Sequence, residues 1–246
     1  MATVPAALSL SIHVPAAAGG DEERVSALLL APPGATAGFV FAHGAGAGMA
    51  HPFMARFAAG LAERGIATLR YQFAYMERGG KRPDPPALAH AVVRAAVAEG
   101  ARQWPGLPLV AGGKSFGGRM SSQAQALAPL PRVAGLLFVG FPLHPAGKPG
   151  TERAEHLSRV SCPMLFLQGT RDELTELALL RGVHEGLGPR STLALFDDAD
   201  HSFHVRASSG SNDAAVMARM LDAAAAWIAQ LVGHAGTADP SGPSAL

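Results

Sequence analysis

The sequence predicts an α/β fold built on one eight-stranded, mostly parallel sheet with helices on both faces. Short apolar runs recur along the chain, and helical patterns lie between most of them. From residue 38 onward these runs are continuously apolar, which indicates strands buried on both faces, as in a parallel sheet. With 246 residues, of which 48% are apolar and 16% charged, the chain has enough apolar surface for one sizeable core.

The first two strands are expected to form an N-terminal antiparallel hairpin at one edge of the sheet. Residues 8–14 alternate between apolar and polar side chains, which is typical of a half-buried strand. A turn-rich stretch follows, and residues 25–31 form the second apolar run. Six further strands are predicted, at residues 38–43, 66–71, 108–112, 133–141, 163–168 and 191–196.

Apolar residues at helical spacing predict helices around residues 53–61, 88–97 and 216–231, the last capped by Ser211 or Asn212. Strands that alternate with helices imply right-handed crossover connections. We expect a single domain over residues 1–232. The stretch 233–246, rich in Gly, Pro, Ser and Ala, is expected to be a disordered tail.

Charge and cysteine content bear on the class of protein. The chain has 20 basic and 19 acidic residues and no basic stripe, so nucleic acid is not an expected partner. No apolar run approaches the roughly 20 residues that span a bilayer, and no signal peptide is found, so no membrane association is expected. The single cysteine, Cys162, favours a reducing compartment, and we expect a cytoplasmic protein. Arginine greatly outnumbers lysine, which we attribute to the composition of a bacterial genome.

The segment Gly113-Lys114-Ser115-Phe116-Gly117 lies between a predicted strand and a predicted helix, the context of a nucleophile elbow. The glycines let strand and helix approach closely, while the turn lifts the serine hydroxyl clear of the sheet and points the Phe116 N–H toward it. Two alternatives remain. In the first, Gly113-Lys114-Ser115 is the end of a phosphate-binding loop, although that motif needs glycine where the chain has Pro108. In the second, the segment is a glycine-rich turn between strand and helix, and Ser115 is a surface residue without a catalytic role.

Asp172 and His201 each follow a predicted strand, at the edge of the sheet where ligands gather in open α/β folds. The order Ser115, Asp172, His201 is the chain order of the triad in α/β-hydrolases. Asp172 is alternatively a helix cap, and His204 competes with His201. The nearby acidic residues are expected to form loops and turns: Asp197, Asp198 and Asp200.

A glycine-rich loop, His43-Gly44-Ala45-Gly46, follows the predicted strand 38–43. Its flexible backbone can turn N–H groups toward an oxyanion, so the expected donors are Phe116 together with Ala45 or Gly44. His43 is expected to steer this loop. The pattern lacks the spacing of a dinucleotide fingerprint, and no histidine pair has metal-ligand spacing beside a carboxylate. We therefore expect neither a cofactor nor a metal.

Four segments together resemble the small α/β-hydrolases related to dienelactone hydrolase. The resemblance covers roughly residues 25–232 and implies an α/β-hydrolase fold with a Ser-Asp-His triad at Ser115, Asp172 and His201. One departure concerns the nucleophile, because dienelactone hydrolase uses cysteine there, whereas Cys162 precedes a strand. Dienelactone is therefore not the expected substrate. The segments are His43-Gly44-Ala45-Gly46, residues 113–118, residues 168–172 and residues 200–203.

The spacing of the later strands predicts that there is no lid domain, because residues 142–162 have room for only one short helix, at 152–157. An open site suits small acyl groups. We expect a monomeric or homodimeric serine hydrolase that cleaves an ester or thioester. The alternative is a non-catalytic interaction or scaffold module, the role of a related branch in a chromatin-acetylating complex. The irregular stretch 72–86 carries three cations that either meet an anionic substrate or are simply solvated: Arg78, Lys81 and Arg82.

Overall fold

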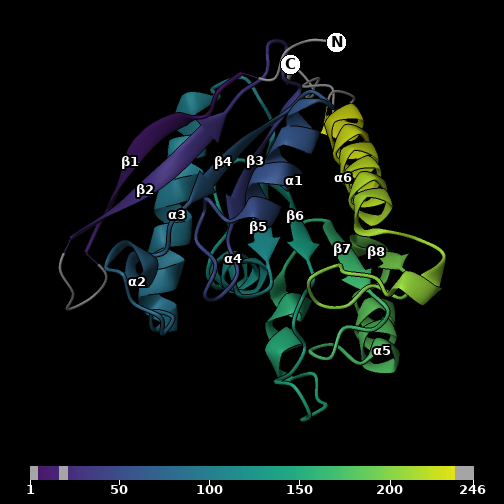
Figure 1. The fold of residues 1–246 in the computed structure, drawn as a ribbon. Coiled ribbons are helices and arrows are strands. Elements are labelled where there is room, and N and C mark those ends of the chain that lie inside the picture. The colour runs from purple at the N-terminus through teal and green to yellow at the C-terminus, as the bar shows by residue number, and fades with distance from the viewer. Residues whose placement is uncertain (1–4, 17–21, 236–246) are drawn as a thin grey trace, which may run out of the picture.

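The computed structural model describes residues 5–16 and 22–235. Its eight strands form one sheet in the order β1-β2-β4-β3-β5-β6-β7-β8 (Figure 1), so the predicted sheet is confirmed. The strands are β1 (Leu8–Val14), β2 (Glu23–Leu30), β3 (Ala37–Ala42), β4 (Ile66–Tyr71), β5 (Leu109–Lys114), β6 (Val133–Val139), β7 (Met164–Gly169) and β8 (Ser191–Phe196).

The N-terminal hairpin lies at one edge of the sheet. Strand β2 pairs antiparallel with both β1 and β4, and the remaining neighbours pair in parallel. In β1, Ile12 and Val14 are buried while Ser9 and Ser11 are exposed, as the alternating pattern predicts. The parallel strands place their carboxyl ends along one edge, which is where the predicted site residues lie.

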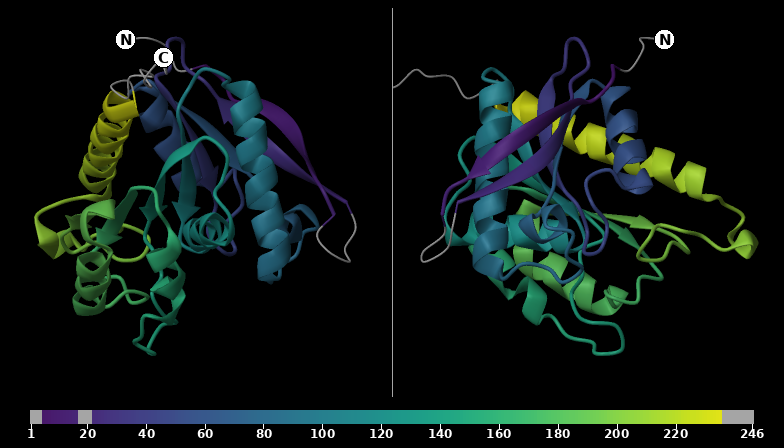
Figure 2. Two further views of the ribbon diagram at one scale, coloured as in Figure 1. Left: turned by 180° about the vertical axis from the view of Figure 1, so that it is seen from behind. Right: turned by 60° about the vertical axis from the view of Figure 1, so that its left-hand side comes forward.

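Helices cover both faces of the sheet (Figure 2). Alternate residues of the buried strands serve two separate cores, which explains their continuously apolar sequences: Phe39 and Phe41 pack in one core, and Val40 packs in the other. Helices α1 and α6 cover the first core, and α3, α4 and α5 cover the second. The helices are α1 (Pro52–Ala62), α2 (Ala74–Glu77), α3 (Pro86–Gln103), α4 (Phe116–Leu127), α5 (Leu177–Leu187) and α6 (Asp213–Ala235).

Helix α6 corrects two expectations from the sequence. It continues through residues 233–235, where the predicted tail begins, and the rest of that tail lies outside the described residues. Its stretch Asp213–Gly233 is also long and apolar enough to cross a membrane, by length and composition alone, contrary to the expectation that no run approaches that length. In the structure Val216, Met220 and Trp227 of this helix are buried against the sheet, as in a core helix.

Residues 140–163 connect β6 to β7, the position at which a lid domain is commonly inserted. They contain one short 3-10 helix, η1 (Glu152–Arg159), and otherwise form loops. The prediction that the fold has no lid domain is therefore confirmed. The stretch 72–86 contains the short helix α2, where the sequence indicated only an irregular loop.

Candidate active site

Ser115 occupies a sharp turn between β5 and α4. Its φ of +49° is a left-handed conformation that few non-glycine residues adopt. The glycines on either side have no room for a side chain. A Cβ added at Gly113 would lie 2.4 Å from the Ala42 carbonyl oxygen, and one at Gly117 would lie 2.6 Å from the His43 carbonyl oxygen. The G-x-S-x-G spacing is thus a steric requirement of this turn.

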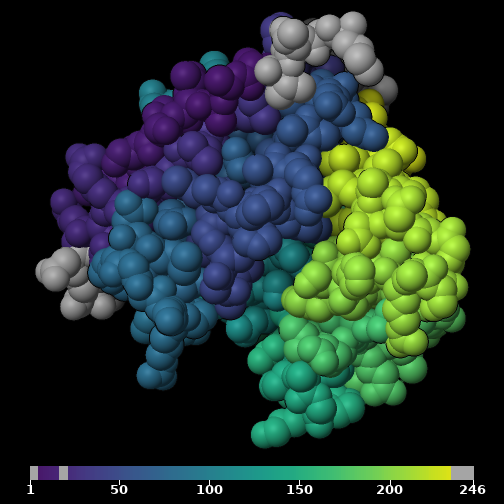
Figure 3. Space-filling model, in the orientation of Figure 1, coloured from purple at the N-terminus to yellow at the C-terminus, as the bar shows by residue number. Residues whose placement is uncertain are grey.

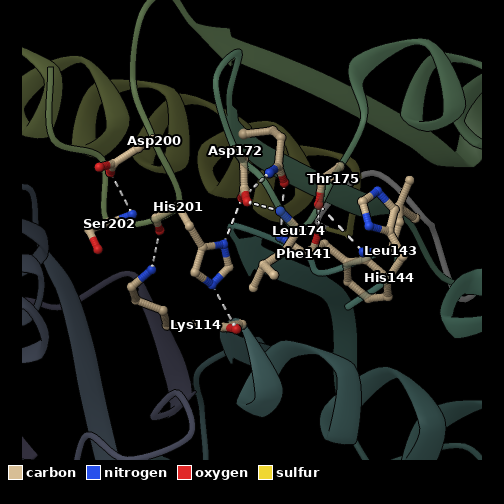
Figure 4. A network of polar contacts seen from close by, with 12 residues as sticks. Lys114, Phe141, Leu143, His144, Asp172, Leu174, Thr175, Asp200, His201 and Ser202 are labelled. Atoms are coloured by element: carbon tan, nitrogen blue, oxygen red, sulfur yellow. Dashed lines mark hydrogen bonds and ion pairs between the residues drawn. The ribbon is translucent and has the colours of Figure 1, made fainter. Parts of the chain in front are cut away.

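A continuous line of hydrogen bonds joins the three predicted catalytic residues (Figure 4). His201 Nε2 lies 2.9 Å from Ser115 Oγ, and His201 Nδ1 lies 2.7 Å from Asp172 Oδ2. The Asp172 side chain is fully buried, while the His201 ring is 22% exposed. Because Asp172 is placed to accept a hydrogen bond from Nδ1–H, the other ring nitrogen, Nε2, is left to accept a hydrogen bond from the serine hydroxyl.

Two amide groups hold Asp172 in place. Its Oδ2 accepts a hydrogen bond from Gln168 Nε2 at 2.6 Å, and its Oδ1 accepts from the Leu174 N–H at 2.8 Å. Gln168 Oε1 in turn accepts from the Phe141 N–H at 2.9 Å, which ties β7 to the segment after β6. No separate role was predicted for Gln168 from the sequence. Its signal was a single amide at the end of an otherwise apolar strand, because a buried amide needs partners.

The other residues that could have served as the acid or the base of the triad lie elsewhere or have other partners. His204 is exposed and pairs with Asp213 at 2.9 Å rather than with Ser115. Asp200 accepts from two main-chain N–H groups of its own loop, as expected of a turn former. Helix α5 begins at Leu177, so Asp172 does not cap it.

Lys114, which precedes the serine, points toward the histidine loop. Its Nζ donates to the His201 carbonyl oxygen at 2.7 Å and lies 5.1 Å and 5.4 Å from the ring centres of Phe53 and Phe203. Burial lowers the pKa of this ammonium to about 8. This arrangement argues against the phosphate-loop alternative, in which the lysine would face bound phosphates.

The glycine-rich loop after β3 lies against the serine. A Cβ added at Gly44 would be 3.7 Å from the Ser115 Cβ. The loop turns at Gly44, whose carbonyl accepts from the Ala47 N–H at 3.3 Å. Phe116 is the first residue of α4, and first-turn N–H groups have no acceptor within their own helix. The structure thus brings together, around cavities that Ser115 also lines, the three residues expected to supply the oxyanion donors: Phe116, Ala45 and Gly44.

His43 ties this loop to the segment after β4. Its Nδ1 lies 2.8 Å from the Gly44 carbonyl oxygen, and its Nε2 accepts from the Phe73 N–H at 3.1 Å. Burial lowers the pKa of His43 to about 4, so the ring is neutral near pH 7. The neutral tautomer with a proton on Nδ1 satisfies both contacts.

Two cavities adjoin Ser115 and share Ala45 and Leu174 in their walls. The histidine-side cavity, of about 340 Å³, is also lined by His201 and Lys114. The arginine-side cavity, of about 380 Å³, is also lined by Pro83, Asp84, Pro86, Phe116, Arg119, Met120, Pro142 and Arg153. Figure 3 shows the surface hollowed between the blue segment that follows β4 and the green segment that follows β6.

The cations singled out in the sequence line neither cavity. Arg78 pairs with Glu23 and with Asp84, at 2.8 Å from the latter, and Lys81 and Arg82 are exposed. The cations that do line the arginine-side cavity, Arg119 and Arg153, were not singled out. Nothing in the local sequence marks them, because the two are brought together only by the fold.

The cysteine is remote from this site. Cys162 precedes β7, at the opposite end of the strand from Asp172, and burial raises its thiol pKa to about 11. Among residues 5–16 and 22–235, no three His, Cys, Asp or Glu side chains are grouped to hold a metal ion.

The sheet order, the elbow and the site at the carboxyl edge define the α/β-hydrolase class of fold. Residues 35–229 match the alpha/beta hydrolase domain family, and the chain belongs to that family. Membership supports a hydrolytic function.

Solved structures show the same fold. Dienelactone hydrolase from Anabaena variabilis is 21% identical, with 92% of this chain and 99% of that chain covered and a TM-score of 0.69. A serine hydrolase without a lid from Xanthomonas campestris is 21% identical, with 97% of each chain covered and a TM-score of 0.65. An alpha-beta serine hydrolase homologue from Coxiella burnetii is 17% identical, with 92% of this chain and 96% of that chain covered and a TM-score of 0.66.

Proposed function

We propose that this chain is a serine hydrolase that cleaves a carboxylic ester or thioester of a small acyl group through an acyl-enzyme at Ser115. One observation carries the proposal: the unbroken hydrogen-bonded line from the Ser115 hydroxyl through His201 to the buried Asp172. A serine hydroxyl is a weak nucleophile unless a base takes its proton, and an oriented histidine is such a base.

In the first half of the reaction, Ser115 Oγ attacks the carbonyl carbon while His201 Nε2 accepts the hydroxyl proton. The negative charge on the carbonyl oxygen is stabilised by the N–H groups of Phe116 and of Ala45 or Gly44. Loss of one such donor commonly lowers the rate by about 10²–10³-fold. His201 then gives its proton to the departing alcohol or thiol, and the carbonyl carbon keeps its new bond to Oγ.

In the second half, water attacks the acyl-enzyme and His201 again acts as the base. Asp172 orients the ring and stabilises the imidazolium formed in each half. Every proton is moved by His201, so the proposed reaction needs no cofactor. The chemistry is the same for an oxygen ester and a thioester, since only the leaving atom differs.

The position of His201 supports a different role for each of the two cavities in the proposed reaction. Because His201 Nε2 protonates the leaving atom, the leaving group must lie on its side of Ser115, in the histidine-side cavity. The acyl part then extends into the arginine-side cavity.

A fluorophosphonate probe, which reacts with activated serines, tests the proposal. Wild type should be labelled and should hydrolyse short 4-nitrophenyl esters. Ser115→Ala should lose both properties, whereas Cys162→Ala should keep them, because that thiol is remote and protonated. Full labelling of Ser115→Ala would show that another residue is the nucleophile. A folded wild type that neither reacts with the probe nor hydrolyses any ester would instead favour an interaction module.

A further inference from the structure

We propose that the arginine-side cavity is a subsite for a carboxylate on the acyl part of the substrate, held by Arg119 and Arg153. This inference rests on the proposed function, because that function places the acyl part of the substrate in the arginine-side cavity. It goes beyond that function by naming the chemical class of the acyl group, a short dicarboxylic acid esterified at one end.

The first observation is that both guanidinium groups lack partners. Within the described residues, neither Arg119 nor Arg153 forms a hydrogen bond or an ion pair through its side chain, and the Nε of Arg119 is buried. The recorded contact of the Arg119 guanidinium is with the Phe116 ring, 6.0 Å from its centre. A buried donor without an acceptor is costly. Arg70 Nε also has no acceptor, but only Arg119 lines the cavity beside Ser115, where a ligand could supply one.

Two other arginines, Arg94 and Arg132, show the usual solution. Arg94 donates to the carbonyl oxygens of Ala124 and Ala128, and Arg132 donates to four carbonyl oxygens around α3. Arg119 and Arg153 differ from these because they face a cavity beside the nucleophile. The cavity that the acyl part would enter is therefore bordered by two guanidinium groups with unused donors.

The second observation is the charge of the cavity wall. Burial and the proximity of Arg153 both lower the pKa of Arg119, which means that two like charges share one partly desolvated space. Asp84 is the acidic residue in this wall, and both of its oxygens are already engaged, one by the Tyr75 N–H and the other by Arg78. The wall is left with a net positive charge.

The third observation is position. Arg119 follows Ser115 by one turn of α4, and its N–H donates to the Ser115 carbonyl oxygen at 3.1 Å. Ser115 and Arg119 both line the arginine-side cavity. Arg153 approaches from η1, in the segment that replaces a lid. A carboxylate between them would lie a few carbon atoms from the scissile carbonyl, and arginine binds carboxylates through paired hydrogen bonds.

The test compares two esters with acyl chains of the same length. One is 4-nitrophenyl hexanoate, and the other is the mono-4-nitrophenyl ester of hexanedioic acid, in which a carboxylate replaces the terminal methyl group. Arg119→Gln and Arg153→Gln should each lower kcat/KM for the carboxylate ester about 10–100-fold, since each removes a charged hydrogen bond. The same changes should alter kcat/KM for the hexanoate less than about threefold.

The matched control is Arg82→Gln, because Arg82 is exposed and its own side chain lines neither cavity. It should leave kcat/KM for both esters within about threefold of wild type, as expected for an exposed, solvent-screened charge. Spontaneous hydrolysis, measured with Ser115→Ala, is subtracted throughout. Equal losses for both esters would mean that the arginines only support the fold. Unchanged rates for the carboxylate ester would also overturn the subsite.

A binding measurement separates the subsite from the proposed function. Monomethyl hexanedioate is titrated calorimetrically into Ser115→Ala and into the double variants Ser115→Ala/Arg119→Gln and Ser115→Ala/Arg82→Gln. Saturable binding that weakens at least about tenfold with Arg119→Gln only would support the subsite even if wild type hydrolyses no ester. In that case the proposed function alone would fail. No binding, or equal binding to all three proteins, would overturn the subsite.

Discussion

Ser115 and His201 lie 2.9 Å apart, yet different kinds of contact hold the segments that carry them. The elbow, residues 113–118, is fixed by close approach of main chain to main chain, with no space at its glycines. The histidine loop, residues 199–204, is fixed by polar contacts, chiefly from Lys114 Nζ and from the Asp200 carboxylate. Steric exclusion dominates at the elbow, whereas in the histidine loop these side-chain hydrogen bonds add to one close approach, that of Gly169 to the Ala199 carbonyl oxygen.

This difference predicts two kinds of response to mutation. Steric exclusion acts over very short distances, so a single added methyl group should disturb the whole elbow. Hydrogen bonds can be removed one at a time, so changes around the histidine should reduce activity in steps while the fold is kept. The following variants test this contrast, beginning with the largest expected effect.

Asp172→Asn should have the largest effect on activity. The amide no longer favours the tautomer with a proton on His201 Nδ1, so Nε2 cannot accept the serine proton. We expect kcat to fall about 10⁴-fold, as in other Ser-His-Asp enzymes. The fold should be kept, but the free energy of unfolding should fall by about 1–3 kcal/mol, because the new NH2 group at the position of Oδ2 faces the Gln168 Nε2 donor in a buried site. A fall in kcat of less than tenfold would place the orienting group elsewhere.

Gly117→Ala tests the elbow. Its Cβ would lie 2.6 Å from both the Ala42 Cβ and the His43 carbonyl oxygen, so the strand and helix must separate. We expect a loss of about 1–3 kcal/mol in the free energy of unfolding, together with a large loss of activity.

Gly182→Ala is the matched control, because this exposed glycine of α5 has no atom within 4 Å of an added Cβ. It should stabilise the protein by about 0.4–1 kcal/mol, because alanine has fewer unfolded conformations to lose. Urea unfolding measures both variants. If the two changes had equal effects, the steric account of the elbow would be wrong.

The same contrast explains what the sequence was able to predict. The elbow is determined within a few residues, so the spacing of Gly113, Ser115 and Gly117 predicted both its position and its geometry. The strands were equally clear, because burial on two faces leaves continuous apolar runs. The order of Asp172 and His201 followed from strands that end at one edge.

The supporting residues were harder to predict, because their partners lie far along the chain. Gln168 reaches Phe141, and Lys114 reaches His201, 87 residues away. Arg119 and Arg153 have no sequence pattern that relates them. The length of α6 was also misjudged, since Gly233 reads as the start of a tail although the helix continues to Ala235. Such features depend on three-dimensional packing.

Lys114→Met tests the hydrogen bonds that hold the histidine loop, and its expected effect on activity is intermediate. Methionine can occupy the space between Phe53 and Phe203 but cannot donate to the His201 carbonyl oxygen. We expect kcat/KM for short esters to fall about 10–100-fold, the range for a lost hydrogen bond from a charged donor. Lys148→Met, at an exposed position, should leave kcat/KM unchanged and serves as the control. Equal values for the two variants would show that the tether does not position His201.

The same variant gives a pH dependence of defined sign. Burial lowers the Lys114 pKa from 10.5 to about 8, so between these pH values the unfolded chain binds this proton more tightly than the folded chain. Stability rises with pH wherever the unfolded state binds more protons. The free energy of unfolding of wild type should therefore increase relative to that of Lys114→Met between pH 8 and 10.5. Urea unfolding at pH 7.5 and pH 10 measures this difference, and a decrease would contradict the buried position of the ammonium.

The smallest expected effect is that of chain length among neutral acyl groups. Neither hydrogen bonds nor steric exclusion distinguishes strongly between neutral chains of different length. Each methylene that becomes fully buried contributes about 0.8 kcal/mol, or about fourfold in kcat/KM. The acyl side is bounded by η1 and two arginines rather than by a lid, so only the first few methylenes can be buried. We expect kcat/KM for 4-nitrophenyl esters to rise from acetyl to about hexanoyl and then to stay level or fall, as the burial argument requires. A steep rise that continued through dodecanoyl esters would show that a partner subunit or a moving segment covers the cavity.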